Sequence, residues 1–359
     1  MTGPALTRGL TLAAISLGSV AALADTASSV MHPDDTDFNV MGFGDISYIS
    51  KDGSNRDGFA IGQGVAHLTA SLSESFMVFG EFSATAKDSE YSFEIERLIV
   101  KYEFSDLYKL SAGRYHTPIG YWNSGFHHGA WLQTTVARPE MIKFGSSIVP
   151  IHFVGILLEG NWNDNSLGLN YKVGFGNGRH QNIARAGDAG DINGDKAWMV
   201  QIGAKPHRLD DIEFGIGYYN DEVALPLGVA VDESTISAFV AKTHGAAEVL
   251  VEFLHSEHEL SADSSVRGDV NAWYAQFAYR LPEDRNDWKP YVRLEHTNVD
   301  DSDPLLGAQG LDYDAGILGV RWDFNPYAAL KAEYRNEEFN NAGRENNLRL
   351  QLSFVLARL

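Results

Sequence analysis

The chain has 359 residues, no cysteine and a formal net charge of −20 at pH 7. The lack of cysteine excludes a disulfide framework and thiolate chemistry. The acidic balance argues against nucleic acid as a partner, because phosphate backbones would be repelled.

The first residues have the order of a secretory signal peptide. A short segment with Arg8 and no acidic residue precedes an apolar run over 10–21, and Ala24 ends a small-x-small cleavage site before Asp25. The run is shorter than the roughly 20 residues that a membrane-spanning helix needs. We therefore expect export, a signal peptide over 1–24, a short segment over 25–37 and one folded unit over 38–359.

Alternation of apolar and polar residues dominates the rest of the chain. Near the end, Leu348, Leu350 and Leu352 share one face, while Arg349 and Gln351 share the other. Strand side chains alternate between faces, so such a segment has one apolar and one polar face. The pattern predicts about 16 strands, at 39–49, 59–71, 75–87, 92–104, 107–115, 151–161, 166–176, 195–205, 211–220, 233–243, 246–256, 270–281, 288–298, 312–324, 327–336 and 346–357.

The connections between these strands alternate between short and long, except for a short one after Lys87. The longer ones are predicted at 50–58, 116–150, 177–194, 221–232, 257–269, 299–311 and 337–345. Short turns on one side and long loops on the other are typical of outer-membrane barrels. We therefore predict an all-β, transmembrane antiparallel barrel. The alternation changes phase near Glu96 and Arg97. Either a β-bulge lies there, or the upper half of the strand leaves the bilayer.

Aromatic residues gather beside the short connections, where amphipathic rings would lie at the headgroup level of a membrane. They are Phe76, Tyr102, Phe104, Tyr108, Trp162, Trp288, Trp322, Phe324 and Tyr327.

The longest connection, 116–150, is too apolar for an exposed external loop. It contains Tyr121, Trp122, Phe126 and Trp131 among other apolar residues, and such a surface demands packing. We expect it to fold into the barrel, with a short helix over 139–144 that begins at a proline.

Four histidines lie in or beside this loop: His116, His127, His128 and His152. One interpretation is a transition-metal site. The other, which the sequence favours, is a set of hydrogen-bonded histidines in a packed loop, because no acidic or thiolate residue has the spacing to complete a metal site. No cofactor is expected.

Charged residues on the polar faces should line the lumen. Among the residues assigned to the inner faces, basic ones outnumber acidic ones, which favours anionic or zwitterionic solutes at the constriction, although acidic residues in the long loops oppose this effect at the mouth. The alternative is that most of these wall charges pair with one another. Arg138 and Glu140 either meet solute or pair with each other. The candidate lumen residues are Arg97, Lys101, Arg280, Arg293, Arg321, Lys331, Arg335 and Arg349 on the wall, and His116, His127, His128, Arg138, Glu140 and Lys143 in the loop.

Motifs of other chemistries are missing from the sequence. Asp191, Asn193 and Asp195 have the opening spacing of a calcium loop, but Lys196 and Ile202 stand where its glycine and glutamate belong. Phosphate-binding loops, zinc-protease motifs and serine-hydrolase motifs do not occur.

The layout resembles the general and phosphate-selective porins of Gram-negative bacteria over roughly 38–359. In sixteen-stranded porins the connection after the fifth strand folds inward and narrows the barrel, and 116–150 occupies that position. The resemblance implies a passive channel for small hydrophilic solutes in outer-membrane lipid. It also implies a homotrimer and a terminal strand, Leu348 to Phe354, that the barrel assembly machinery recognises.

Three other functions stay open. A barrel plugged by 116–150 would bind or adhere and would not conduct. An outer-membrane enzyme would have catalytic groups clustered at one rim. A secreted soluble β-protein would be found in the periplasm or the medium.

Overall fold

The computed structural model describes residues 36–51, 57–87, 90–126, 129–162, 166–209, 211–340 and 342–358. The chain separates into two units, Met1–Thr36 and Asp37–Leu359. The predicted signal peptide and its cleavage site lie outside the described residues. Among the helices of the described part, none is long and apolar enough to cross a membrane.

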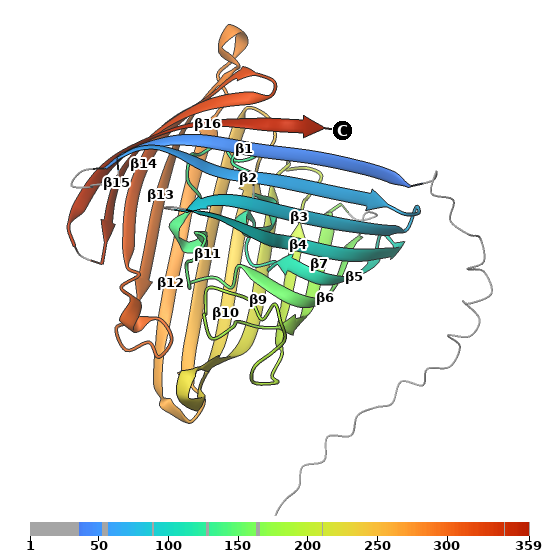
Figure 1. The fold of residues 1–359 in the computed structure, drawn as a ribbon, viewed down its shortest axis with the longest axis vertical. Coiled ribbons are helices and arrows are strands. Elements are labelled where there is room, and N and C mark those ends of the chain that lie inside the picture. Colours follow the sequence, from blue (N-terminus) through green and yellow to red (C-terminus); the bar gives the residue numbers. More distant parts are fainter. Residues whose placement is uncertain are drawn as a thin grey trace, which may run out of the picture. The chain divides into compact units, whose positions relative to one another are not determined.

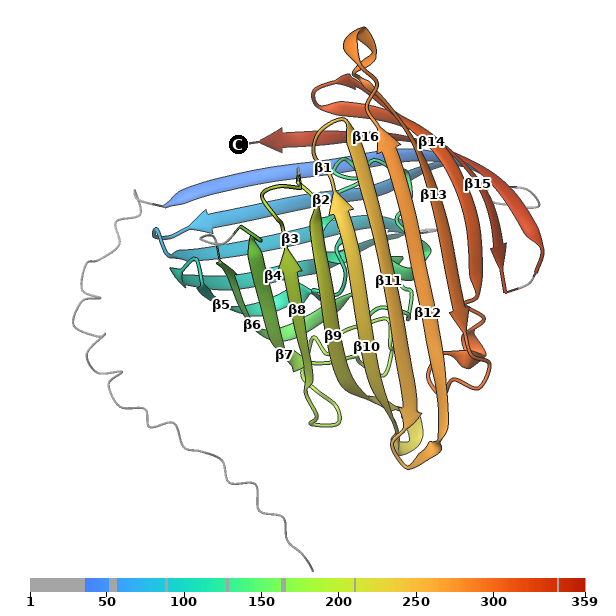
Figure 2. The same ribbon diagram turned by 180° about the vertical axis from the view of Figure 1, so that it is seen from behind.

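Sixteen antiparallel strands form a closed barrel, as predicted, in which neighbours in the chain pair and β1 pairs with β16. Figures 1 and 2 both show β16 beside β1, where the barrel closes. The strands are β1 Asp37–Lys51, β2 Gly58–Ser71, β3 Phe76–Lys87, β4 Glu90–Ser105, β5 Tyr108–His116, β6 His152–Trp162, β7 Leu169–Asn177, β8 Ala197–Ala204, β9 Glu213–Leu225, β10 Val229–Lys242, β11 Ala247–Leu260, β12 Asp263–Tyr279, β13 Trp288–Val299, β14 Tyr313–Asn325, β15 Ala328–Phe339 and β16 Arg344–Arg358.

Side chains alternate between the inside and the outside of the barrel. In β13, Tyr291 and Arg293 are buried, whereas Val292 and Leu294 are 38% and 51% exposed on the outer face. A closed barrel satisfies its backbone hydrogen bonds between strands, so an apolar exterior of this kind is suited to lipid.

The phase change in β4 is a bulge, which was one of the two alternatives left open by the sequence. Glu81 of β3 pairs with Arg97, and the next residue, Phe82, pairs with Ile95. Glu96 is therefore the extra residue on β4. Its side chain is buried, because the bulge turns it from the outer face to the interior.

Two predicted long loops are mostly strands instead, and a third, 337–345, is shortened to 340–343 between β15 and β16. β9 and β10 are joined only by Pro226–Gly228, and β11 and β12 are joined by residues 261–262, so the prediction of long connections at 221–232 and 257–269 is wrong. The charged residues there suggested loops. Backbone pairing nevertheless continues through these segments. Their polar side chains can lie in water on the outer face, because the strands extend past the part of the barrel whose exterior is apolar.

The two ends of the barrel differ. We call the end with the connections 72–75, 106–107, 163–168, 205–212, 243–246, 280–287 and 326–327 the turn end, and the opposite one the loop end. The aromatic residues predicted beside the turns lie there. Trp288 and Trp322 stack with ring centroids 5.2 Å apart, and Phe104 and Tyr327 are 65% and 67% exposed. Rings so placed suit a membrane interface.

Candidate pore and the loop inside it

The connection between β5 and β6, residues 117–151, lies against the inner wall of the barrel. The guanidinium of Arg293 donates a hydrogen bond of 3.0 Å to the carbonyl of Ala137. Arg321 donates one of 2.9 Å to the carbonyl of Gln133. Basic side chains of β13 and β14 therefore hold the main chain of the loop.

Carboxylates of the wall hold the same loop through its N–H groups. Glu333 of β15 accepts a hydrogen bond of 3.1 Å from Val136, and Glu252 of β11 accepts one of 2.7 Å from Trp122. In the described parts of the loop, 117–126 and 129–151, the helices are two short ones, α1 Trp122–Gly125 and η2 Glu140–Ile142. Buried main-chain groups outside regular structure need such partners, because leaving them without any is costly. The short helix predicted over 139–144 corresponds to η2.

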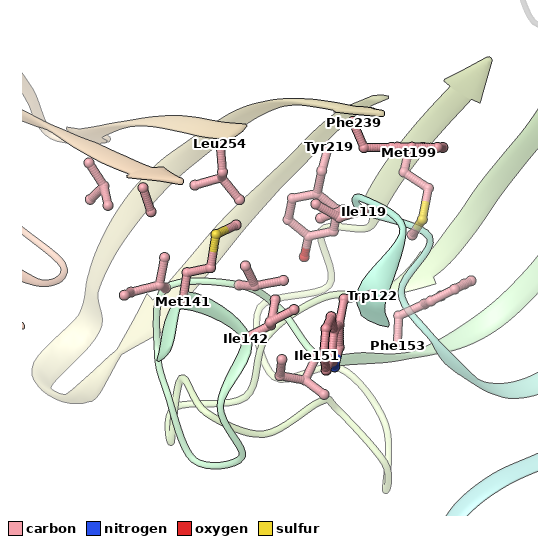
Figure 3. Close-up of a cluster of buried hydrophobic side chains, with 14 of the residues drawn as sticks. Ile119, Trp122, Met141, Ile142, Ile151, Phe153, Met199, Tyr219, Phe239 and Leu254 are labelled. Atoms are coloured by element: carbon pink, nitrogen blue, oxygen red, sulfur yellow. The ribbon is translucent and has the colours of Figure 1, made fainter. Parts of the chain in front are cut away.

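Apolar side chains fill the space between the loop and strands β6–β11. Figure 3 shows Ile119, Trp122, Met141 and Ile142 of the loop facing side chains from the inner faces of the strands. Those strand residues are Phe153, Met199, Tyr219, Phe239 and Leu254. The inner face is apolar here, so the expectation that inward residues are hydrophilic is wrong for this part of the barrel.

A cavity of about 200 Å³ lies between the loop and the wall formed by β4–β7, toward the turn end. Arg97, Lys101 and Lys172 line it, together with Glu159 and His116. Lys101 forms an ion pair of 2.7 Å with Glu159. Arg97 forms an ion pair of 2.5 Å with Glu81, which lies outside the lining. The lining is therefore mostly basic, but two of its three basic residues have a carboxylate partner.

A second cavity, of about 410 Å³, lies on the same side of the barrel toward the loop end. Glu94, Glu96 and His152 are part of its lining. A third, of about 310 Å³, shares Gln63 and Phe144 with it. These three cavities in the described part thus lie along β16 and β1–β7, between the wall and the internal loop.

No family model matches the chain, and no curated protein matches it. Solved structures match over most of its length. The anion-selective porin from Comamonas acidovorans has a TM-score of 0.64 at 10% identity, over 90% of this chain and 100% of that one. This chain has the fold of the Gram-negative porins.

Two other structures with the porin fold support this result. The outer membrane channel DcaP of Acinetobacter baumannii has a TM-score of 0.58 at 12% identity, over 90% of this chain and 99% of that one. OmpT of Vibrio cholerae, in its trimer form, has a TM-score of 0.56 at 16% identity, over 89% of this chain and 98% of that one. The likeness in strand layout noted from the sequence is confirmed as a likeness of fold.

Within the porin fold, part of the predicted basic wall lies under the loop. Arg293, Lys331 and Arg335 face inward, but they are 0%, 0% and 1% exposed. Arg321 is also buried. The prediction that these four residues border the water-filled lumen is wrong, because the loop's carbonyl groups and the neighbouring carboxylates take up their hydrogen-bonding capacity.

The other predicted wall residues lie elsewhere. Arg97 and Lys101 line the cavity near the turn end. Arg280 lies at the turn end, 2.8 Å from Asp323, and Arg349 is on the inner face of β16. Lys172 on the inner face of β7 was not predicted; it faces Glu159 across the strand pair. The signal that could have found it is its place between the apolar residues Tyr171 and Val173, which alternate with it.

The predicted loop residues are divided between the interior and the loop's surface. Arg138 is partly buried over the ring of Phe144, with 3.6 Å from its guanidinium carbon to the ring centroid. Burial lowers the pKa of Arg138 to about 9, and the nearby Glu96 opposes this effect. Glu140 forms an ion pair of 3.0 Å with Lys143, whose side chain is 54% exposed. One of the alternatives from the sequence was an ion pair of Glu140 with Arg138, and the partner of Glu140 is Lys143 instead.

The histidines have carboxylate neighbours. His116 and His152 lie 3.3 Å and 3.2 Å from the nearest carboxylate oxygens, which belong to Glu81 and Glu96. His127 and His128 lie outside the described residues. His67, which the sequence did not single out, also lies 2.7 Å from a buried carboxylate.

Among the residues that the structure describes, one group has its potential metal-ligating atoms within 4.8 Å of one another: His255, Glu257 and Asp269. The buried neighbours Leu254 and Ser256 on β11 show that His255 and Glu257 point outward. The group therefore lies outside the barrel and does not contribute to the cavities.

Proposed function

We propose that this protein is a passive channel of a Gram-negative outer membrane, through which small hydrophilic solutes diffuse. The observation that carries the proposal is the contrast between an apolar exterior and charged cavities inside a closed barrel. Such a barrel can span lipid without leaving backbone groups unpaired. Structures of the same fold that are named porins and channels support the proposal.

The preferred solutes are anions. Arg97, Lys101 and Lys172 border the cavity near the turn end, against Glu159 in its lining and Glu81, which pairs with Arg97 at 2.5 Å. Wall charges act on a solute at close range, where few water molecules screen them. A structural neighbour that is named an anion-selective porin agrees with this preference.

We further propose a homotrimer, which has support in a neighbour solved in trimer form. The barrel assembly machinery would recognise the last strand, β16, which closes the barrel against β1. The role is transport without catalysis and needs no cofactor. The exported chain would have lost residues 1–24.

Conductance of the purified protein in a planar bilayer tests the function. We expect steady current and, in a KCl gradient, a reversal potential that shows chloride preference. The variant Lys101→Gln with Lys172→Gln should reduce that preference. Lys205→Gln is the control, because Lys205 is a turn residue paired with Asp211 at 2.8 Å. A pore that prefers potassium contradicts the anion preference alone.

The plugged barrel is the second candidate function, and the buried attachment of the loop favours it. It predicts negligible conductance from correctly folded protein. Deletion of residues 120–145 would then open the barrel, whereas in a working channel the same deletion would only widen an existing path.

A further inference from the structure

Three histidines and two carboxylates form a connected series along the inner wall, from β2 to β6. Nε2 of His67 lies 2.7 Å from Oε1 of Glu81, and Nε2 of His116 lies 3.3 Å from Oε2 of the same residue. Nε2 of His152 lies 3.2 Å from Oε2 of Glu96. The rings of His116 and His152 have centroids 5.2 Å apart, which joins the two halves of the series.

The carboxylates of this series are buried, with Glu81 at 0% and Glu96 at 4% exposure. Ser83 donates a hydrogen bond to Glu96. Charged groups face the series from every neighbouring element. Arg97 on β4 lies 2.5 Å from Glu81. Arg114 on β5 lies 3.8 Å from Glu96 and 2.7 Å from Asp188. The ion pair of Glu94 with Arg185 and the side chain of Arg138 from the loop are the other charged groups near the series.

The series lies between the cavities described above. His116 lines the cavity of about 200 Å³ near the turn end, and His152 and Glu96 line the cavity of about 410 Å³ near the loop end. A solute that follows the β2–β7 wall from one cavity to the other passes this series. Its charge therefore acts on the solute at short range.

We propose that His67, His116 and His152 determine the ion preference of the channel, so that anions are favoured more strongly as the pH falls. The inference rests on the proposed channel function. Imidazole is the side chain whose ordinary titration range spans pH 5 to 8. The arginines stay charged over that range, so each proton bound by an imidazole adds one positive charge to the wall.

The direction of the effect does not depend on which group binds the proton. Protonation of a carboxylate in the series removes a negative charge, and protonation of a histidine adds a positive one. Both changes attract anions and repel cations. A unit charge about 8 Å from an ion in water contributes about 0.5 kcal/mol, and it acts with opposite sign on chloride and potassium.

The test is the reversal potential of the purified protein in a KCl gradient at pH 8 and pH 5. We expect the permeability ratio of chloride to potassium to rise about fivefold at pH 5, since one added charge shifts the two ions in opposite directions. In the variant His67→Gln, His116→Gln, His152→Gln, most of this rise should disappear. Glutamine keeps a hydrogen-bonding group but does not titrate.

The matched control is His255→Gln with His296→Gln. Both residues point outward, where His255 contacts Asn271 at 2.9 Å and His296 contacts Asp314 at 2.8 Å. This control should keep the full rise. If the triple variant does not fold, as judged by the heat-dependent shift of barrel proteins on gels, Glu96→Gln replaces it. That substitution should raise the chloride preference at pH 8.

The outcomes separate the two proposals. The inference is overturned if the wild-type permeability ratio of chloride to potassium is equal at both pH values. It is also overturned if the folded triple variant keeps the full rise of that ratio at pH 5. Neither result contradicts the proposed channel function. A chloride preference of Glu96→Gln at pH 8 no higher than wild type also overturns it. A folded protein that conducts at neither pH overturns the channel function, and the inference with it.

Discussion

The carboxylate of Glu252 on the barrel wall accepts a hydrogen bond of 2.7 Å from the backbone N–H of Trp122 in the internal loop. The same carboxylate accepts one of 2.9 Å from the N–H of Tyr121 and one from the hydroxyl of Tyr274. Glu252 is 2% exposed. One buried negative charge thus fixes the first turn of the loop, where α1 begins.

Replacing Glu252 by glutamine should loosen this end of the loop. An amide offers one acceptor oxygen in place of two, so a backbone N–H loses its charged partner at a cost of about 2 kcal/mol. We expect noisier single-channel current and faster hydrogen exchange over 117–126. Glu257→Gln is the control, because its side chain lies on the same strand but is 70% exposed. Equal current noise and equal hydrogen exchange over 117–126 in both variants would contradict this role of Glu252.

Gly120→Ala should give the same result by another route. Gly120 has φ of +70°, and an added Cβ would collide with the carboxylate of Glu252. The left-handed backbone alone costs about 1–2 kcal/mol for an L-residue. Gly145→Ala isolates that backbone cost, because Gly145 has φ of +77° with no heavy atom near its Cβ position. Hydrogen exchange of the loop should therefore rise more in Gly120→Ala, and an equal rise would show that the collision is unimportant.

Trp122→Ala should detach the loop from the apolar cluster. Trp122 is fully buried, and truncation of a buried tryptophan costs about 3–5 kcal/mol. Because the strands pair independently of the loop, the barrel should stay folded while the loop becomes accessible to protease. Leu132→Ala is the comparison, since Leu132 is 42% exposed. Protection of residues 117–151 equal to that of the wild type would speak against the packing of Trp122 as the loop's anchor.

Glu233→Gln should release the connection between β7 and β8. Glu233 of β10 holds Arg179 of that connection through two contacts of 2.7 Å, and both side chains are almost fully buried. Removing one partner of a buried pair leaves an uncompensated charge, at a cost of about 3–5 kcal/mol. Limited proteolysis should cut 178–196 faster in this variant.

The pair of Glu94 and Arg185 offers a control on the same connection. The side chain of Arg185 is 45% exposed, and exposed pairs contribute about 0–1 kcal/mol. Glu94→Gln should therefore change the cleavage rate little. A larger effect from Glu94→Gln than from Glu233→Gln would reverse this ranking of the two pairs.

Much of the fold could be predicted because its signals are local. The alternation in β13 and the phase change at Glu96 each depend on residues adjacent in the chain. The ends of β9–β12 could not be predicted, since charged residues such as Glu257 suit both a loop and a solvated strand. His67 was missed for a similar reason, because neighbouring small residues weaken the alternation that would have placed it inside.

The sequence by itself determined the closed barrel with apolar residues outside, because a period of two fixes the face of each side chain without reference to the rest of the chain. Only the tertiary structure decided which inward charges border a cavity. That choice depends on where the internal loop lies, through contacts such as that of Val136 with Glu333, 197 positions apart in the chain. The loop covers Arg293 and Lys331 and leaves Arg97 and Lys101 beside a cavity, because charged side chains of β11–β15 hold much of its main chain.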